Sequence, residues 1–197
     1  MLPRRFSVKY FVSNPEHVEL SKFVPIFQRW IQRDLVEGLL IDVAAYEHVH
    51  EGPGILLIGD EGDYSLDIRD GRPGLMYTRK RQITGTLPDV LRVSTRLALI
   101  AVQKLLAEPS IKGIEFDTSE VQITMLDRLN FPNTPEALDV LKSEVEQVAG
   151  ALYEGSSVTV ELAYADPREP LSVIVKASGQ FDLAALIDRL TGETITS

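Results

Sequence analysis

Four short apolar segments separated by tight-turn residues fill positions 39–80, and this pattern restricts the fold more than any other feature of the sequence. The segments read LLIDVAAYEHV, GILLIG, DYSLDIR and GLMYTRK, and the breaks between or inside them carry HEGPG, DEG and DGRP. Glycine, proline and aspartate are typical of hairpin turns, because they adopt the backbone angles that tight turns need. The sequence therefore predicts an antiparallel meander.

Helical and strand patterns flank this meander. RFSVKYFV alternates like a strand, and apolar residues at three- and four-residue spacing predict a helix at about 21–36. A second helix should open at Thr86, where Asp89 would complete a capping box, and continue to about residue 107. A third should run from the cap Thr134 to Gly155.

The remaining segments continue the mixed pattern. We expect GIEF and EVQITML to pair around DTSE, and SVTVELAYA and LSVIVKA to pair about the turn DPREP. FDLAALIDRL is predicted to form a short closing helix. The fold class that follows is α+β, a mainly antiparallel sheet with helices packed on one face.

An internal repeat is predicted at an offset of 117 residues, without a gap. The matched positions include Pro15 with Pro132, Gly38 with Gly155, Pro53 with Pro170, Gly62 with Gly179 and Leu66 with Leu183. Such matches fall on turns and helix ends, which backbone geometry constrains most. We therefore expect two related ferredoxin-like subdomains. The first spans residues 1–112 with an inserted hairpin at 63–80, and the second, acidic one spans residues 113–197.

Composition excludes several classes of function. The chain has no cysteine, so disulfides, thiolate nucleophiles and cysteine-bound metal centres are absent. No apolar run approaches the roughly 20 residues of a membrane-spanning helix, and no signal-peptide pattern opens the chain, so we expect a cytoplasmic protein. The net charge of −9 argues against nucleic-acid binding.

The three histidines supply one candidate metal site. His48 and His50 would project from the same face of a strand, with Glu47, Glu51, Asp60 and Asp63 nearby as oxygen ligands. The alternative is a pair of solvent-facing histidines at a strand end. Further along, the acids of DEGDYSLD lack the calcium-loop pattern, and we interpret them as a solvated turn.

Basic residues gather on the first half of this acidic chain. Residues 69–96 hold seven arginines and lysines against two acids, whereas the excess of negative charge lies after residue 98. The candidate surface is Tyr77, Arg79, Arg81, Arg92 and Arg96. It is predicted to bind a protein partner or an anion, because guanidinium groups favour carboxylates and phosphates. The alternative is that these arginines are solvated or pair with the acidic second half.

The function expected from the sequence is that of a cofactor-free, non-enzymatic binding or regulatory protein. It would contact a protein partner, or a second copy of itself, through complementary charge. Two alternatives remain open, a small metal-dependent enzyme or metal binder that uses His48 and His50, and an anion-binding protein that uses the arginines. Nucleophilic catalysis has little support, because no nucleophile motif is present.

Overall fold

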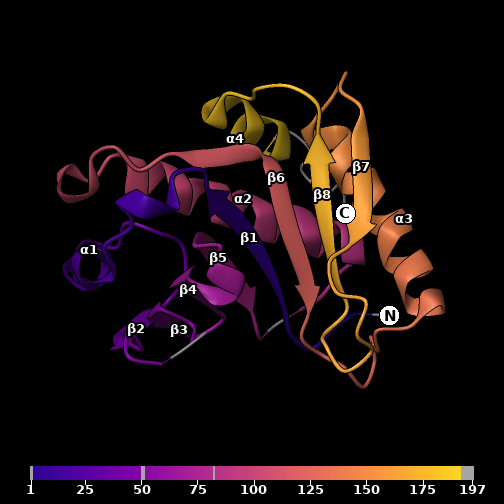
Figure 1. The fold of residues 1–197 in the computed structure, drawn as a ribbon, viewed down its shortest axis with the longest axis horizontal. Coiled ribbons are helices and arrows are strands. Elements are labelled where there is room, and N and C mark those ends of the chain that lie inside the picture. The colour runs from indigo at the N-terminus through magenta and orange to yellow at the C-terminus, as the bar shows by residue number, and fades with distance from the viewer. Residues whose placement is uncertain (1, 50–51, 82, 192–197) are drawn as a thin grey trace.

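One antiparallel sheet of eight strands forms the centre of the computed structural model, which describes residues 2–49, 52–81 and 83–191 (Figure 1). The strands are β1 (Phe6–Val12), β2 (Leu40–Ala45), β3 (Ile55–Gly59), β4 (Gly62–Asp67), β5 (Gly74–Arg79), β6 (Phe116–Met125), β7 (Val158–Leu162) and β8 (Ser172–Ala177). Their order across the sheet is β2-β3-β4-β5-β1-β6-β8-β7. The predicted meander is confirmed as β2 to β5.

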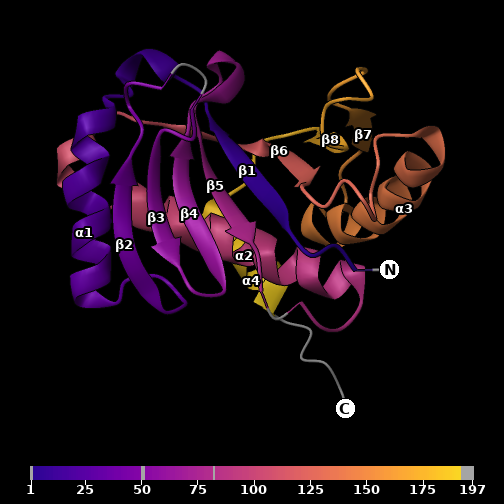
Figure 2. The same ribbon diagram turned by 90° about the horizontal axis from the view of Figure 1, so that it is seen from below.

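The helices pack against one face of this sheet, as predicted, and leave the other face open (Figure 2). They are α1 (Phe23–Arg33), α2 (Leu87–Leu106), α3 (Pro135–Leu152) and α4 (Leu183–Thr191), with short 3-10 turns at Pro15–His17, Leu20–Lys22, Arg69–Gly71 and Pro109–Ile111. The long helix α2 lies against β1 and β5 and contacts α3 and α4. Its buried leucines and alanines cover the centre of the sheet.

Strand β1 separates the two faces most clearly. Phe6, Val8 and Tyr10 belong to the hydrophobic core, whereas the alternate residues Ser7 and Lys9 belong to the open face. β1 pairs with β5 on one side and with β6 on the other, so it lies in the middle of the sheet. This central position explains why even its polar residues are buried.

The start of α2 has the capping residues that the sequence predicts. The Thr86 hydroxyl accepts a hydrogen bond from the Asp89 amide at 3.3 Å, and the Asp89 carboxylate accepts one from the Thr86 amide at 3.3 Å. The predicted capping box is therefore confirmed. The first helix is shorter than predicted, because Asp34 adopts a left-handed conformation at φ 51° and ends it after Arg33.

The hairpin predicted around DTSE is wrong. Phe116 of GIEF, the break DTSE and residues 121–125 form one continuous strand, β6, that bridges β1 and β8. The polar break does not turn because the Asp117 carboxylate accepts hydrogen bonds from the amide of Ser119 at 2.8 Å and from its hydroxyl at 2.5 Å. Pairing with two neighbouring strands then outweighs the turn preference of these residues.

The sheet continues across the expected boundary between residues 112 and 113, because β6 of the second part pairs with β1 of the first. The division into subdomains stays a prediction, and the ferredoxin-like duplication is not confirmed. Within the described residues, every helix falls short of the length and apolar character that crossing a membrane requires.

Candidate functional site

The open face of the sheet carries an unusual set of polar side chains. Strand alternation directs them away from the helices, and such residues usually meet solvent. Here they are buried instead. They are Ser7, Lys9, Asp63, Ser65, Asp67, Thr78, Gln122, Thr124 and Ser172, each less than 9% exposed. Segments that connect the strands wall in this face and create two adjoining pockets.

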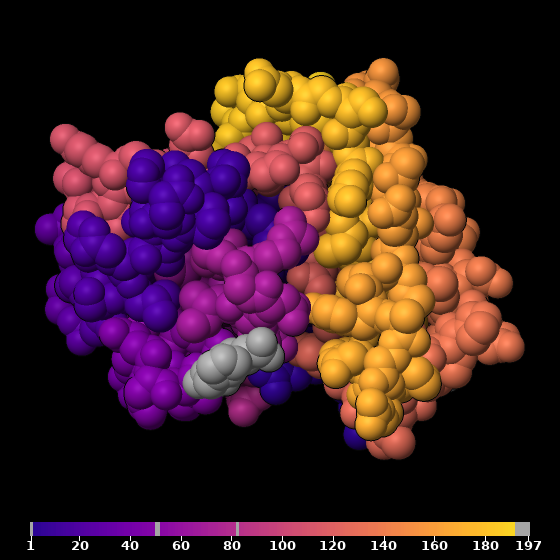
Figure 3. All heavy atoms as spheres, viewed as in Figure 1, coloured from indigo at the N-terminus to yellow at the C-terminus, as the bar shows by residue number. Residues whose placement is uncertain are grey.

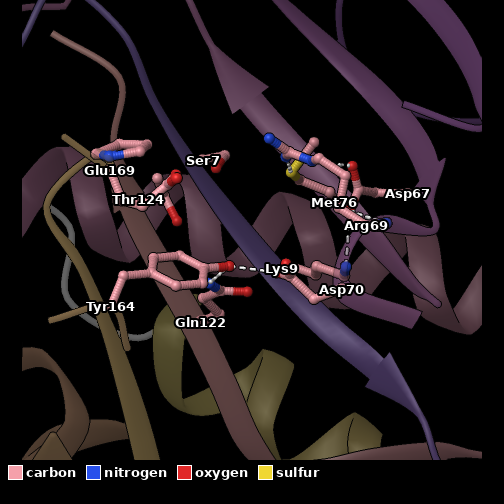
Figure 4. Close-up of a pocket in the computed structure, with 11 residues that line it drawn as sticks. Ser7, Lys9, Asp67, Arg69, Asp70, Met76, Gln122, Thr124, Tyr164 and Glu169 are labelled. Carbon is pink, nitrogen blue, oxygen red and sulfur yellow. Dashed lines mark hydrogen bonds and ion pairs between the residues drawn. The ribbon is translucent and has the colours of Figure 1, made fainter. Parts of the chain in front are cut away.

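The central pocket lies over β1 and β6 and has a volume of about 240 Å³ (Figure 4). Its lining residues come from four strands, the turn after β4 and the loop between β7 and β8. They are Ser7, Lys9, Asp67, Arg69, Asp70, Met76, Gln122, Thr124, Tyr164, Glu169 and Pro170. Figure 3 shows this face hollowed between the magenta atoms of the first half and the orange atoms of the second.

An adjoining pocket of about 440 Å³ continues the hollow over β3, β4 and β5. Arg69 and Met76 line both pockets, so the two form one depression, which we call the trough. The adjoining part is more apolar. Its lining is Arg5, Tyr46, Pro53, Leu56, Asp63, Arg69, Met76, Thr78 and Leu126.

A chain of three charged side chains, of which Lys9 and Asp67 are buried, forms part of the trough floor. The Lys9 ammonium lies 2.7 Å from one oxygen of Asp67, and the other oxygen accepts from Arg69 Nε at 2.8 Å. Burial lowers the pKa of Lys9, and the adjacent Asp67 carboxylate opposes that shift. These three groups together carry one excess positive charge, and the acids Asp70 and Glu169 line the same pocket.

Hydroxyl and amide groups complete the floor. Gln122 donates to the Ser172 hydroxyl at 2.9 Å and to the Tyr164 hydroxyl at 3.2 Å, and the Thr124 and Ser172 hydroxyls lie 2.8 Å apart. Within the described residues, the Ser7 hydroxyl has no hydrogen-bond partner, although its residue is only 2% exposed. A buried hydroxyl that lines a cavity without a partner is available to a ligand.

One contact spans the central pocket from wall to wall. The Tyr164 hydroxyl, on the loop after β7, donates to the Asp70 carboxylate on the turn after β4 (Figure 4). Burial and this hydrogen bond raise the pKa of Tyr164. The contact fixes the loop and the turn relative to each other, so the pocket keeps its shape between them.

The predicted arginine surface is divided by the structure. Tyr77 is 3% exposed and faces the core, where its ring lies 4.9 Å from that of Tyr64. Arg79 donates to the Tyr77 hydroxyl at 3.4 Å and to Glu61 at 2.9 Å. Arg96 on α2 reaches Glu37 at 3.2 Å, beside the same tyrosine pair.

The other two arginines have acidic neighbours of their own. Arg81 lies 2.5 Å from Asp60 after β3, and Arg92 lies 3.8 Å from Asp89 at the start of α2. The acidic partners given above for these arginines belong to the first half of the chain. Pairing with the acidic second half, one of the two alternatives for them, is not what these contacts show.

The candidate metal site is tested only in part. His48 is exposed in the turn after β2, and His50 lies outside the described residues. Within the described residues, no group of three or more His, Asp or Glu side chains could hold a metal ion. Metal binding by this pair stays a prediction.

The solvated turn predicted for DEGDYSLD is wrong for two of its acids. Asp60 and Glu61 do lie in the turn between β3 and β4, but Asp63 and Asp67 lie on β4 and are almost completely buried. Each is neutralised by a lysine at 2.7 Å, Asp63 by Lys80 and Asp67 by Lys9. Their even, four-residue spacing along a strand was the signal that could have placed both on one face.

Comparisons with protein-family models, curated proteins and solved structures found no match to this chain. The geometry of the trough is therefore the basis for assigning a function.

Proposed function

We propose that this chain is a non-enzymatic binding protein that holds its ligand in the trough on the open face of the sheet. The observation that carries the proposal is a concave, polar floor of buried side chains on a sheet face that none of the described helices covers. Ligand sites in proteins are concave, largely preformed and equipped with a few well-placed polar groups. The trough has each of these properties.

The arrangement supports binding over catalysis. Lys9, Asp67 and Arg69 are engaged with one another, and Asp70 accepts from Tyr164. In the described part of the chain, no base lies within hydrogen-bond distance of the Ser7 hydroxyl to activate it. These groups hold one another in place, which suits recognition of a ligand.

A fragment screen followed by protein NMR tests this proposal. Small molecules of mixed charge should shift the amide signals of β1, β5, β6 and the loop between β7 and β8. Thr124→Phe should abolish those shifts by filling the central pocket, whereas Thr159→Phe, outside the pocket lining, should leave them unchanged. Hits that gather elsewhere, or no hits, would contradict the proposal.

The charge-complementary surface at Tyr77, Arg79, Arg81, Arg92 and Arg96 is a second candidate, for a protein partner. The observation in its favour is the exposure of Arg81. Its side chain is 64% exposed, whereas that of Arg79 is 18% exposed. An acidic partner would have to displace Asp60 and Glu61 from these arginines. If this surface binds, Arg79→Glu with Arg81→Glu will weaken the association, most strongly at low salt.

We also propose that the two parts of the chain arose by duplication at the offset of 117. The shift brings α1 onto α3, β2 onto β7 and β3 onto β8, although β4 falls on residues 179–184, which include only the start of α4. The pair Ser7 and Thr124, which are opposite each other on β1 and β6, also differ by 117. Superposing residues 6–59 on 123–176 in an experimental structure tests the proposal, and unrelated paths of the chain would contradict it.

A further inference from the structure

The trough is polar at one end and apolar at the other, and this separation indicates the chemical class of its ligand. The floor of the central pocket presents Ser7, Lys9 and Arg69, while the adjoining pocket presents Leu56, Met76 and Leu126. Because Arg69 and Met76 line both pockets, one molecule can occupy the two at once. A polar head and an apolar tail would suit these two environments.

The charge of the floor selects the sign of the head group. Both oxygens of Asp67 are occupied, one by Lys9 at 2.7 Å and the other by Arg69 at 2.8 Å. The Arg69 guanidinium donates from Nη2 to Met76 Sδ at 3.5 Å, and no second carboxylate among the described residues accepts from it, while Ser7 adds a free hydroxyl. A carboxylate fits these donors, since guanidinium groups and hydroxyls bind its two oxygens.

Acidic groups also line the central pocket, but they lie at its rim. Asp70 and Glu169 are both exposed, and Asp70 already accepts from Tyr164. Solvent and salt screen exposed charges far more than buried ones. Lys9 is buried on the floor and so is screened less than these rim acids, and Arg69, whose side chain is 42% exposed, extends its guanidinium beside it.

We propose that the trough binds a small carboxylate with an apolar tail, the carboxylate between Ser7 and Arg69 and the tail against Leu56 and Met76. This inference rests on the proposed function, and it adds the chemical class of the ligand. Both simple carboxylic acids and apolar amino acids carry this chemistry. The small volume of the central pocket, about 240 Å³, restricts the head to a few atoms.

Three probes, each with a phenyl ring on a short carbon chain but with different charged groups, test the charge of the head group by titration calorimetry. They are 3-phenylpropionate, L-phenylalanine and 2-phenylethylamine. We expect 3-phenylpropionate to bind and 2-phenylethylamine to bind at least tenfold more weakly. If L-phenylalanine binds more tightly than 3-phenylpropionate, the rim acids accept its ammonium group and the ligand is an amino acid, and if it binds more weakly the ligand is a simple carboxylic acid. Equal or tighter binding of the amine would overturn the inference.

Matched variants locate the two ends of the ligand. Arg69→Gln should weaken 3-phenylpropionate binding at least tenfold, while Arg72→Gln, on the same turn but outside the pocket lining, should not. Leu56→Ala should weaken binding through the tail. Ile58→Ala, on the same strand and face but outside both pocket linings, is its control. Equal effects within either pair would contradict the assignment.

The two proposals fail in different ways. If neutral or cationic fragments shift the trough signals in the NMR screen while 3-phenylpropionate does not bind, the trough remains a binding site and the carboxylate inference is wrong. If no fragment of any charge shifts those signals, both proposals are wrong. Should Arg69→Gln fail to fold, the comparison of the three probes on the unmodified protein still decides the sign of the head group.

Discussion

Asp67 is the residue on which the charged groups of the trough depend, because it pairs with both Lys9 and Arg69. Asp67→Asn leaves the Lys9 ammonium buried without a carboxylate, and removing one partner of a buried pair costs about 3–5 kcal/mol. Lys9→Met should cost less, because Asp67 retains Arg69. Urea unfolding measures both, and the double variant should recover part of the loss. A larger cost for Lys9→Met would contradict this order.

Tyrosine ionisation supplies a pH-dependent prediction. Burial is the largest cause that raises the pKa of Tyr10, Tyr64, Tyr77, Tyr153 and Tyr164 above the ordinary value of 10.0. The folded protein then keeps protons that the unfolded chain releases. This contribution to stability is complete below pH 10 and is lost as the pH rises through the folded pKa values.

Phenolate absorbance and circular dichroism, followed together through an alkaline titration, measure this effect. These five tyrosines should ionise only as the protein unfolds. Phenolate absorbance that develops fully with an ordinary midpoint, while circular dichroism stays native, would contradict the prediction.

At the scale of single elements, the two threonine caps differ in a way that stability measurements can detect. Thr86 and Asp89 exchange hydrogen bonds at the start of α2, whereas Thr134 only accepts one from Ala137 at 3.4 Å. Thr86→Ala should cost about 0.5–2 kcal/mol, and Thr134→Ala less. Chemical unfolding of both variants checks the order, and a larger loss at Thr134 would count against it.

Two glycines should respond to alanine with opposite signs. Gly150 lies within α3 with nothing within 4 Å of an added Cβ, so Gly150→Ala should stabilise the protein by about 0.5–1 kcal/mol. A Cβ at Gly74 on β5 would overlap the carbonyl oxygen of Tyr10, so Gly74→Ala should destabilise it. Thermal unfolding compares the two, and a stabilising Gly74→Ala would contradict this packing of β5 against β1.

Elements with strong local signals were predictable from the sequence. The capping box at Thr86, the turns of the meander and the strand alternation of β7 and β8 each depend on residues close together in the chain. Strand β6 could not be predicted in this way, because the turn-like residues DTSE are held extended by pairing with strands distant in sequence. Local preference predicts an element only where tertiary pairing does not oppose it.

At the scale of the whole molecule, the trough itself could not be predicted. Ser7 and Lys9 have the alternation of an ordinary solvent-facing strand surface, and no local pattern shows that the distant loop with Tyr164 will enclose them. The arginine surface was predicted from the number of basic residues in one segment, but that number does not show which acidic residues contact these arginines in the fold. The helix-covered sheet was predictable from local patterns. The burial of its polar face was not, because it depends on contacts between residues distant in the chain.

The central claim is that an open trough with a positively charged floor receives the ligand, and the absence of cysteine allows a direct test. Ser7→Cys places a single thiol on the floor, and Thr159→Cys places one on exposed β7 as a control. At each of the two positions, the rate at which the thiol is modified is measured with an anionic and with a cationic methanethiosulfonate reagent. A positively charged cleft should favour the anionic reagent on the floor by about tenfold relative to the control. A thiol on the floor that reacts with neither reagent, or faster with the cationic one, would contradict the account.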